Sequence, residues 1–145
     1  MSGELVEWRA GVRTLLHCGA STGGTQLCVI EQWCDPGQGA PLHTHHEVEE
    51  VLLFREGEAE VVLGDERRRV EAGEAMRVPA HTWHSFENVG RGTLRVVGVF
   101  AAAAAPVEYA HEPGVVLEVG GVAAEMRDAH RAVRAVPPGA GAASP

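Results

Sequence analysis

The chain has 145 residues, a length that suits one domain with one hydrophobic core. Twelve basic and 20 acidic residues give a net charge of −8, which argues against nucleic acid or an anionic membrane as the main partner. Its three cysteines are odd in number and form no Cys-x-x-Cys pair, so we expect no disulfide framework. Residues 1–8 include acidic side chains and no apolar run of signal-peptide length, and no stretch is long enough to span a bilayer, so we expect a cytoplasmic protein.

Short strand-like segments separated by glycine-bearing turns fill the first 100 residues. We expect residues 1–11 to form a loose arm and find no convincing helix before residue 100. The predicted strands cover residues 12–18, 25–34, 51–54, 58–63, 67–70, 75–79, 83–88 and 93–100. This pattern predicts an all-β sandwich or barrel.

The character of the chain changes after residue 100. Residues 101–105 are a run of alanines that we expect to connect two elements, and residues 115–119 predict an outer strand. Residues 122–136 have helical composition and spacing, and prolines follow them. We therefore divide the chain into an N-terminal arm with the first strand (1–24), a barrel core (25–100), a C-terminal extension packed on the barrel (101–136) and a disordered tail (137–145).

The stretch from residue 43 to residue 57 carries the strongest chemical signal. His43 and His45 are two residues apart, so on an extended strand their side chains point to the same face. Glu50 opens an apolar strand that ends at Gly57. Imidazole nitrogen and carboxylate oxygen together suit divalent Fe, Mn, Ni, Co, Cu or Zn. A histidine pair alone also fits hydrogen bonding within a barrel or at its surface.

A second stretch, residues 73–88, provides a third imidazole. Glycine and proline frame a short strand, and His84 begins the next one. If this strand lies opposite the first, His43, His45, Glu50 and His84 form a metal site with one oxygen and three nitrogen ligands. Four protein ligands leave positions open on a six-coordinate ion for water, substrate or dioxygen.

Several nearby residues compete for roles in this site. Glu49 replaces Glu50 as ligand if the strand register slips by one residue, whereas His46 and Glu47 read as a solvated rim. His81 is either an exposed turn residue or an acid–base group at the cavity mouth. We expect four residues to line the pocket: Phe54, Met76, Val78 and Phe86. Gln32 and Arg95 are candidates for a polar contact inside the barrel, and Cys34 either lines the cavity or is an inert buried thiol.

These two stretches together resemble the cupin superfamily. Its first motif, G-x5-H-x-H-x3-4-E-x6-G, is matched from Gly37 through the two histidines and Glu50 to Gly57. Its second motif, G-x5-P-x-G-x2-H-x3-N, is matched at four positions: Gly73, Pro79, His84 and Asn88. His81 stands where the family usually has glycine. Two long patterns in order are far more specific than either alone.

The resemblance implies an antiparallel jelly-roll β-barrel over about residues 25–100, with one divalent transition metal inside it. It also implies a small-molecule substrate or ligand and a homodimer. We expect a metal-dependent enzyme and favour dioxygenase-type oxidative chemistry, with Glu50 and His81 as its acid–base groups. The alternatives are a Lewis-acid isomerase, cyclase or lyase, a sugar isomerase or epimerase, and a non-catalytic cupin that binds a ligand or a metal.

Overall fold

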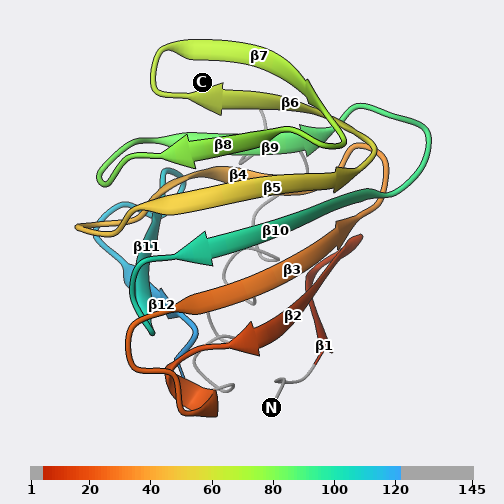
Figure 1. Ribbon diagram of the computed structural model, residues 1–145. Coiled ribbons are helices and arrows are strands. Elements are labelled where there is room, and N and C mark those ends of the chain that lie inside the picture. The colour runs from red at the N-terminus through yellow and green to blue at the C-terminus, as the bar shows by residue number, and fades with distance from the viewer. Residues whose placement is uncertain (1–4, 122–145) are drawn as a thin grey trace.

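The computed structural model describes residues 5–121 and shows two antiparallel sheets that face each other (Figure 1). Strands of the first sheet run in the order β1-β2-β3-β10-β5-β8, and those of the second in the order β12-β11-β4-β9-β6-β7. No helix in residues 5–121 is long and apolar enough to cross a membrane.

The first sheet consists of β1 (Leu5–Arg9), β2 (Val12–Cys18), β3 (Cys28–Cys34), β10 (Leu94–Phe100), β5 (Glu50–Glu56) and β8 (Ala75–Val78). The second consists of β12 (Val116–Val119), β11 (Ala105–Tyr109), β4 (Gly39–Thr44), β9 (His84–Asn88), β6 (Glu58–Leu63) and β7 (Glu66–Glu71). One short 3-10 helix, η1 (Ala20–Thr22), lies in the connection between β2 and β3.

Alternation of buried and exposed side chains explains why these segments are strands. In β10 and β9 every second residue is buried, as expected when one face of a sheet covers a core and the other is outside. The predicted all-β jelly-roll architecture is confirmed, and the outer strand expected at residues 115–119 is β12.

At Gly57, between β5 and β6, the backbone passes close to the backbone of Thr93. Gly57 has a φ of +85°, and a Cβ atom there would lie 2.7 Å from the carbonyl oxygen of Thr93. Glycine alone meets both requirements without strain. The glycine at the end of the first cupin motif therefore lets β5 turn tightly into β6 beside the start of β10.

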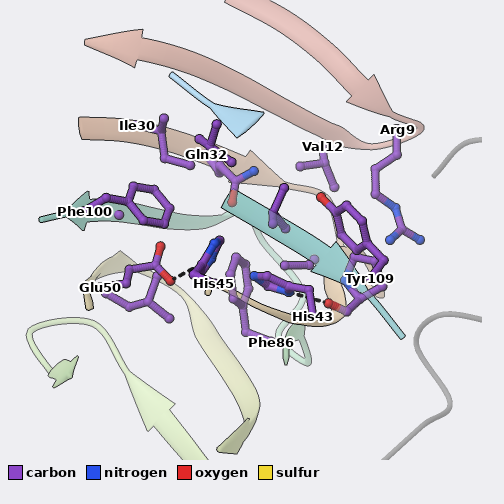
Figure 2. A pocket seen from close by; sticks show the side chains of 17 residues that line it. Arg9, Val12, Ile30, Gln32, His43, His45, Glu50, Phe86, Phe100 and Tyr109 are labelled. Atoms are coloured by element: carbon purple, nitrogen blue, oxygen red, sulfur yellow. Dashed lines mark hydrogen bonds and ion pairs between the residues drawn. The ribbon is translucent and has the colours of Figure 1, made fainter. Parts of the chain in front are cut away.

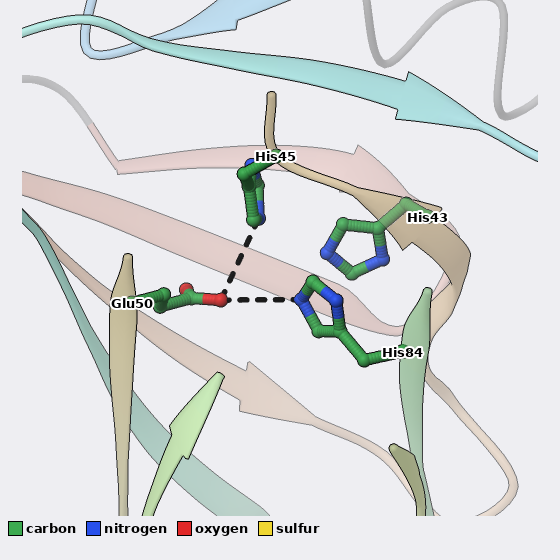
Figure 3. A group of neighbouring side chains, drawn as sticks. All are labelled: His43, His45, Glu50 and His84. Atoms are coloured by element: carbon green, nitrogen blue, oxygen red, sulfur yellow. Dashed lines mark hydrogen bonds and ion pairs between the residues drawn. The ribbon is translucent and has the colours of Figure 1, made fainter. Parts of the chain in front are cut away.

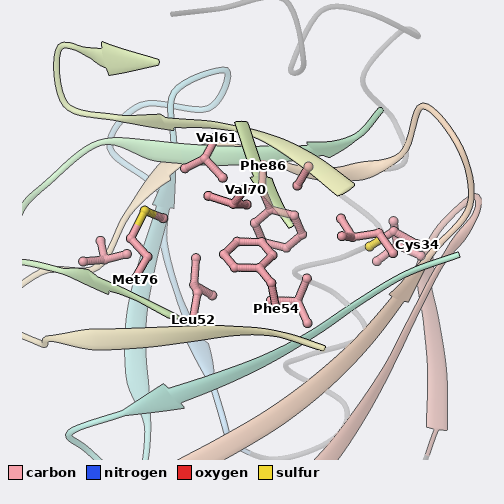
Figure 4. Close-up of a cluster of buried hydrophobic side chains, with 12 residues drawn as sticks. Cys34, Leu52, Phe54, Val61, Val70, Met76 and Phe86 are labelled. Carbon is pink, nitrogen blue, oxygen red and sulfur yellow. The ribbon is translucent and has the colours of Figure 1, made fainter. Parts of the chain in front are cut away.

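Two apolar clusters fill the space between the sheets. The larger includes Phe54, Val61 and Phe86, with the Phe54 and Phe86 rings edge to face at a centroid distance of 6.2 Å (Figure 4). The other includes Ile30 and Phe100 and lies next to the side chains described below. Burial of these groups is the main force that holds the sheets together.

The barrel extends beyond residues 25–100 on both sides. Leu5–Arg9 form β1 in place of the expected loose arm, paired with β2 through a turn at Gly11. Strands β11 and β12 belong to the second sheet, so residues 105–119 are part of the barrel wall. The helix expected at residues 122–136 and the tail at 137–145 lie outside the described residues.

Candidate metal centre

Four buried side chains converge between the two sheets (Figure 3). His43 lies on β4 and His45 just beyond its end, Glu50 begins β5, and His84 begins β9. His43 and His84 are direct partners in the β4–β9 ladder, which places their rings side by side with centroids 4.1 Å apart. The fold thus joins two stretches that are about 40 residues apart in the chain.

The ligand atoms of these four residues all lie within 4.8 Å of one another. Oε1 of Glu50 is 3.2 Å from Nε2 of His84 and 3.5 Å from Nε2 of His45. Such spacing is compatible with one ion at the common centre, because neighbouring ligands of an ion bound at about 2.0–2.2 Å are about 3–4 Å apart.

Backbone carbonyls fix the orientation of all three imidazoles. The Nδ1–H groups of His43, His45 and His84 donate hydrogen bonds to carbonyl oxygens of Pro41 (2.6 Å), Pro106 (2.8 Å) and Thr82 (2.8 Å). A carbonyl only accepts, so in each neutral ring the proton is on Nδ1 and Nε2 presents a lone pair. This is the arrangement in which outer hydrogen bonds orient metal-binding histidines.

The three Nε2 lone pairs and the carboxylate therefore form a cluster of hydrogen-bond acceptors with no donor among them. Nε2 of His45 is buried and has no hydrogen-bond partner, and the carboxylate of Glu50 faces the lone pairs. A buried polar group without a partner is costly, and a cation at the centre satisfies all four groups at once. The donor set fits a divalent transition metal of the class predicted from the sequence, since it combines neutral imidazole nitrogen with carboxylate oxygen.

Electrostatics agree with that assignment. Burial, with the nearby His84 and His45, holds the pKa of His43 well below its usual value, so its ring is neutral and free to bind a metal. For Glu50, burial raises the pKa, but the neighbouring His45 and His84 outweigh burial and lower the pKa to about 2. Glu50 is thus a carboxylate at neutral pH.

Glu49 is excluded as the alternative ligand. Its side chain is exposed, and its Oε2 accepts a hydrogen bond from Arg77 at 2.8 Å on the outside of the sheet. Glu50, one residue later, points inward as strand alternation requires. The register proposed from the sequence is therefore the one that the structure has.

An open cavity lies against the ligands (Figure 2). It contains about 590 Å³ of space free of protein atoms, part of it open to solvent, and His43, His45 and Glu50 form part of its wall. The remaining wall is largely apolar, with Ile30 and Phe100 among the contributors.

Only one of the four predicted pocket residues lines this cavity. All four belong to the larger apolar cluster, but only Phe86 also borders the cavity. The side chains of Phe54, Met76 and Val78 also point inward, but they pack within that cluster and do not border the cavity, so inward direction alone does not place a side chain in the pocket.

Of the other three candidates, Gln32, Arg95 and Cys34, only Gln32 lines the cavity. Gln32 lines the cavity and donates a hydrogen bond to the hydroxyl of Thr14 at 2.9 Å. Arg95 points outward and pairs with Glu31. Cys34 lies in the apolar cluster, where burial raises its pKa to about 12, so it is an inert thiol at neutral pH.

His81 is exposed and is not part of the cavity wall. It adopts a left-handed backbone conformation with a φ of +61°, and its N–H donates to the carbonyl oxygen of His45 at 3.0 Å. The histidine thus forms for itself the turn for which the family usually has glycine. Its imidazole contacts His46 instead of the metal centre.

The cavity residues that the sequence interpretation does not include are mostly apolar wall residues, but Arg9, Gly98 and Tyr109 are also among them. Arg9 lies in the segment expected to be a loose arm, and Tyr109 in the expected extension. Gly98 sits within a strand of valines, which is a recognised sign that another group approaches the backbone. A Cβ atom at Gly98 would lie 2.8 Å from Oε2 of Glu50, so this glycine makes room for the carboxylate.

Comparison with known proteins agrees with this architecture. A family model described as a cupin domain matches residues 33–100. These residues form a cupin domain. An uncharacterized protein of Methanocaldococcus jannaschii is 29% identical over 107 residues, which are 74% of this chain and 81% of that protein.

Solved cupin structures share the fold. KdgF from Halomonas sp. superimposes with a TM-score of 0.61 at 22% identity, over 69% of this chain and 88% of that one. An oxalate oxidase in complex with the substrate analogue glycolate gives a TM-score of 0.65 at 21% identity, over 74% of this chain and 60% of that one. At these identities the likeness concerns the fold.

Proposed function

We propose that this cupin is a metal-dependent enzyme that acts on a small organic acid, and we favour oxidative chemistry of the dioxygenase type. The observation that carries the proposal is a cluster of four convergent acceptor groups, of which His43, His45 and Glu50 lie in the wall of a cavity open to solvent. His43, His45, Glu50 and His84 hold the ion. A bound divalent transition metal supplies open coordination positions at which substrate and dioxygen meet, or a Lewis acid that polarises a carbonyl.

The chain's own groups then orient the substrate and move its proton. Among residues 5–121, Glu50 is the only carboxylate in the cavity wall, so we assign proton transfer there to Glu50. The apolar wall excludes water from the face of the ligands that the substrate covers. His81 lies outside the wall, so we leave it out of the proton-transfer step.

An acidic substrate is indicated by Arg9. Its side chain lines the cavity beside Tyr109, and in the view of Figure 2 it lies on the far side of His43 from Glu50. Burial lowers the pKa of Arg9, and within residues 5–121 no carboxylate pairs with this guanidinium. A partly buried cation without a partner favours an anionic ligand, and a carboxylate fits guanidinium geometry best.

Names of structural neighbours support the same substrate class. They include oxalate oxidase in complex with glycolate and oxalate decarboxylase, whose printed ligands and substrates are small carboxylic acids. Their names describe an oxidase and a decarboxylase of the same acid on one fold, which is why the fold alone does not choose the reaction.

Two alternatives make different predictions. A Lewis-acid isomerase, cyclase or lyase turns its substrate over without dioxygen. A non-catalytic cupin binds an organic acid tightly and leaves it unchanged. Metal analysis of protein purified without added metal, followed by oxygen-uptake measurements on a panel of small hydroxy-, keto- and dicarboxylic acids that includes oxalate and glycolate, separates the three.

Near-stoichiometric metal with acid-dependent oxygen uptake supports the proposal, and turnover that persists anaerobically overturns the oxidative part of it.

Arg9→Gln should raise KM for the acid about 10–100-fold, the loss expected for one charged hydrogen bond. The matched control is Arg13→Gln, because Arg13 pairs with Asp35 on the outside of the same sheet. Equal KM values in wild type and Arg9→Gln would overturn the acidic-substrate assignment.

A further inference from the structure

Outside the cavity, His46 contacts both His81 and Glu108, and all three are residue types that can bind a metal. His46 follows β4, His81 lies in the turn before β9, and Glu108 is on β11. Nδ1 of His46 and Nδ1 of His81 are 3.4 Å apart, with the ring centroids at 5.6 Å. Both rings are reached by solvent, so this cluster is separate from the buried centre.

Glu108 fixes the proton of His46. Its Oε1 lies 2.6 Å from Nε2 of His46, and its Oε2 accepts a hydrogen bond from the backbone N–H of Gly114 at 3.0 Å. A carboxylate accepts, so Nε2 of His46 carries the proton and donates it. In the neutral ring Nδ1 is then a lone pair, and this lone pair faces His81.

We propose that Nδ1 of His46 and Nδ1 of His81 bind a second divalent cation of the zinc and copper class. Two nitrogens bound to one tetrahedral ion, each at about 2.0–2.1 Å, are about 3.4 Å apart, which is the separation found here. Glu108 then has the place that a carboxylate takes behind a metal-binding histidine. Water fills the remaining positions, because both rings are at the surface.

The backbone supports a specific use of His81. Its φ of +61° lies in the left-handed region, where a side chain with a Cβ atom strains the backbone and glycine does not. Glycine would make the same turn with less strain, yet this chain has His81 there, and its imidazole contacts that of His46. A hydrogen bond between the two rings is the competing interpretation, and it takes up no metal.

The chain offers a matched variant and a matched control. His81→Gly removes the imidazole and suits the backbone, so the fold is retained. His17→Ala is the control, because His17 also pairs through Nε2 with a glutamate, Glu31, at 2.8 Å. Its side-chain exposure is 38%, against 35% for His46, but no second imidazole contacts it among the described residues.

The experiment titrates zinc into the full chain against a chromophoric chelator. Wild type and His17→Ala should each bind one more equivalent than His81→Gly, a difference that does not depend on how much metal the buried centre already holds. Long-range 1H–15N spectra should show the Nδ1 signals of His46 and His81 moving with that equivalent. Equal zinc uptake by wild type and His81→Gly, or a titration that leaves both Nδ1 signals unmoved, would overturn the second site.

Discussion

Replacing Gly98 by alanine tests the metal centre without removing a ligand. The new Cβ atom would lie 2.8 Å from Oε2 of Glu50, against 3.4 Å or more for an ordinary contact, so the carboxylate has to move by about 0.6 Å. Such a displacement is at the tolerance of a functional site. We expect metal affinity to fall about 10–100-fold, or about 1.4–2.7 kcal/mol, as when a group that orients a ligand is lost.

The assay is competition with a chelator for zinc, combined with thermal unfolding with and without EDTA. Because the stabilisation of a fold by a ligand grows with the logarithm of the affinity, the gain in Tm from metal should shrink by about 4–8 °C in Gly98→Ala. Gly92→Ala is the control, since a Cβ there meets nothing within 4 Å. Metal affinity of Gly98→Ala within about threefold of wild type would refute the assignment of Glu50 as a ligand that Gly98 accommodates.

Two further perturbations address the ligands and the outer face of the first sheet. His84→Ala should lower metal content at least about 100-fold while circular dichroism still shows a folded barrel, and full occupancy by elemental analysis would remove His84 from the site. For Glu31, burial raises the pKa, but hydrogen bonds from His17 and Arg95 outweigh burial and lower the pKa. The Glu31 carboxylate therefore stabilises the fold fully at pH values above its unfolded pKa of 4.5, and this stabilisation is lost as the pH falls below 4.5. Glu31→Gln should therefore cost about 1–2 kcal/mol in urea unfolding at pH 7 and much less at pH 3, and an equal loss at both pH values contradicts this reasoning.

Much of the barrel and the donor set could be predicted from the sequence because both depend on local spacing. Strand alternation sets which residues point inward, and the two motifs place His43, Glu50 and His84 in register. The predicted homodimer and cytoplasmic location stay predictions.

The pocket could not be predicted in the same way. Position along the barrel axis depends on the register between strands, and alternation carries no information about it. Alternation therefore predicts Phe54 in the cavity, whereas its ring packs against Phe86 within the apolar cluster and does not line the cavity. Arg9 was missed because β1 is short and exposed at the sheet edge, so its membership of the sheet depends on pairing with β2.

The orientation of the ligands has its origin in the assembled barrel. The carbonyls that hold the three imidazoles belong to Pro41 on β4, Thr82 before β9 and Pro106 on β11, three segments that meet only when the second sheet forms. The unfolded chain has the same four donor side chains but none of this orientation, so metal binds the folded state more tightly and stabilises it. Small shifts of these three segments alter the ligand geometry while the donor set stays the same. Cupins with one set of ligands can therefore differ in metal and reaction through residues outside that set.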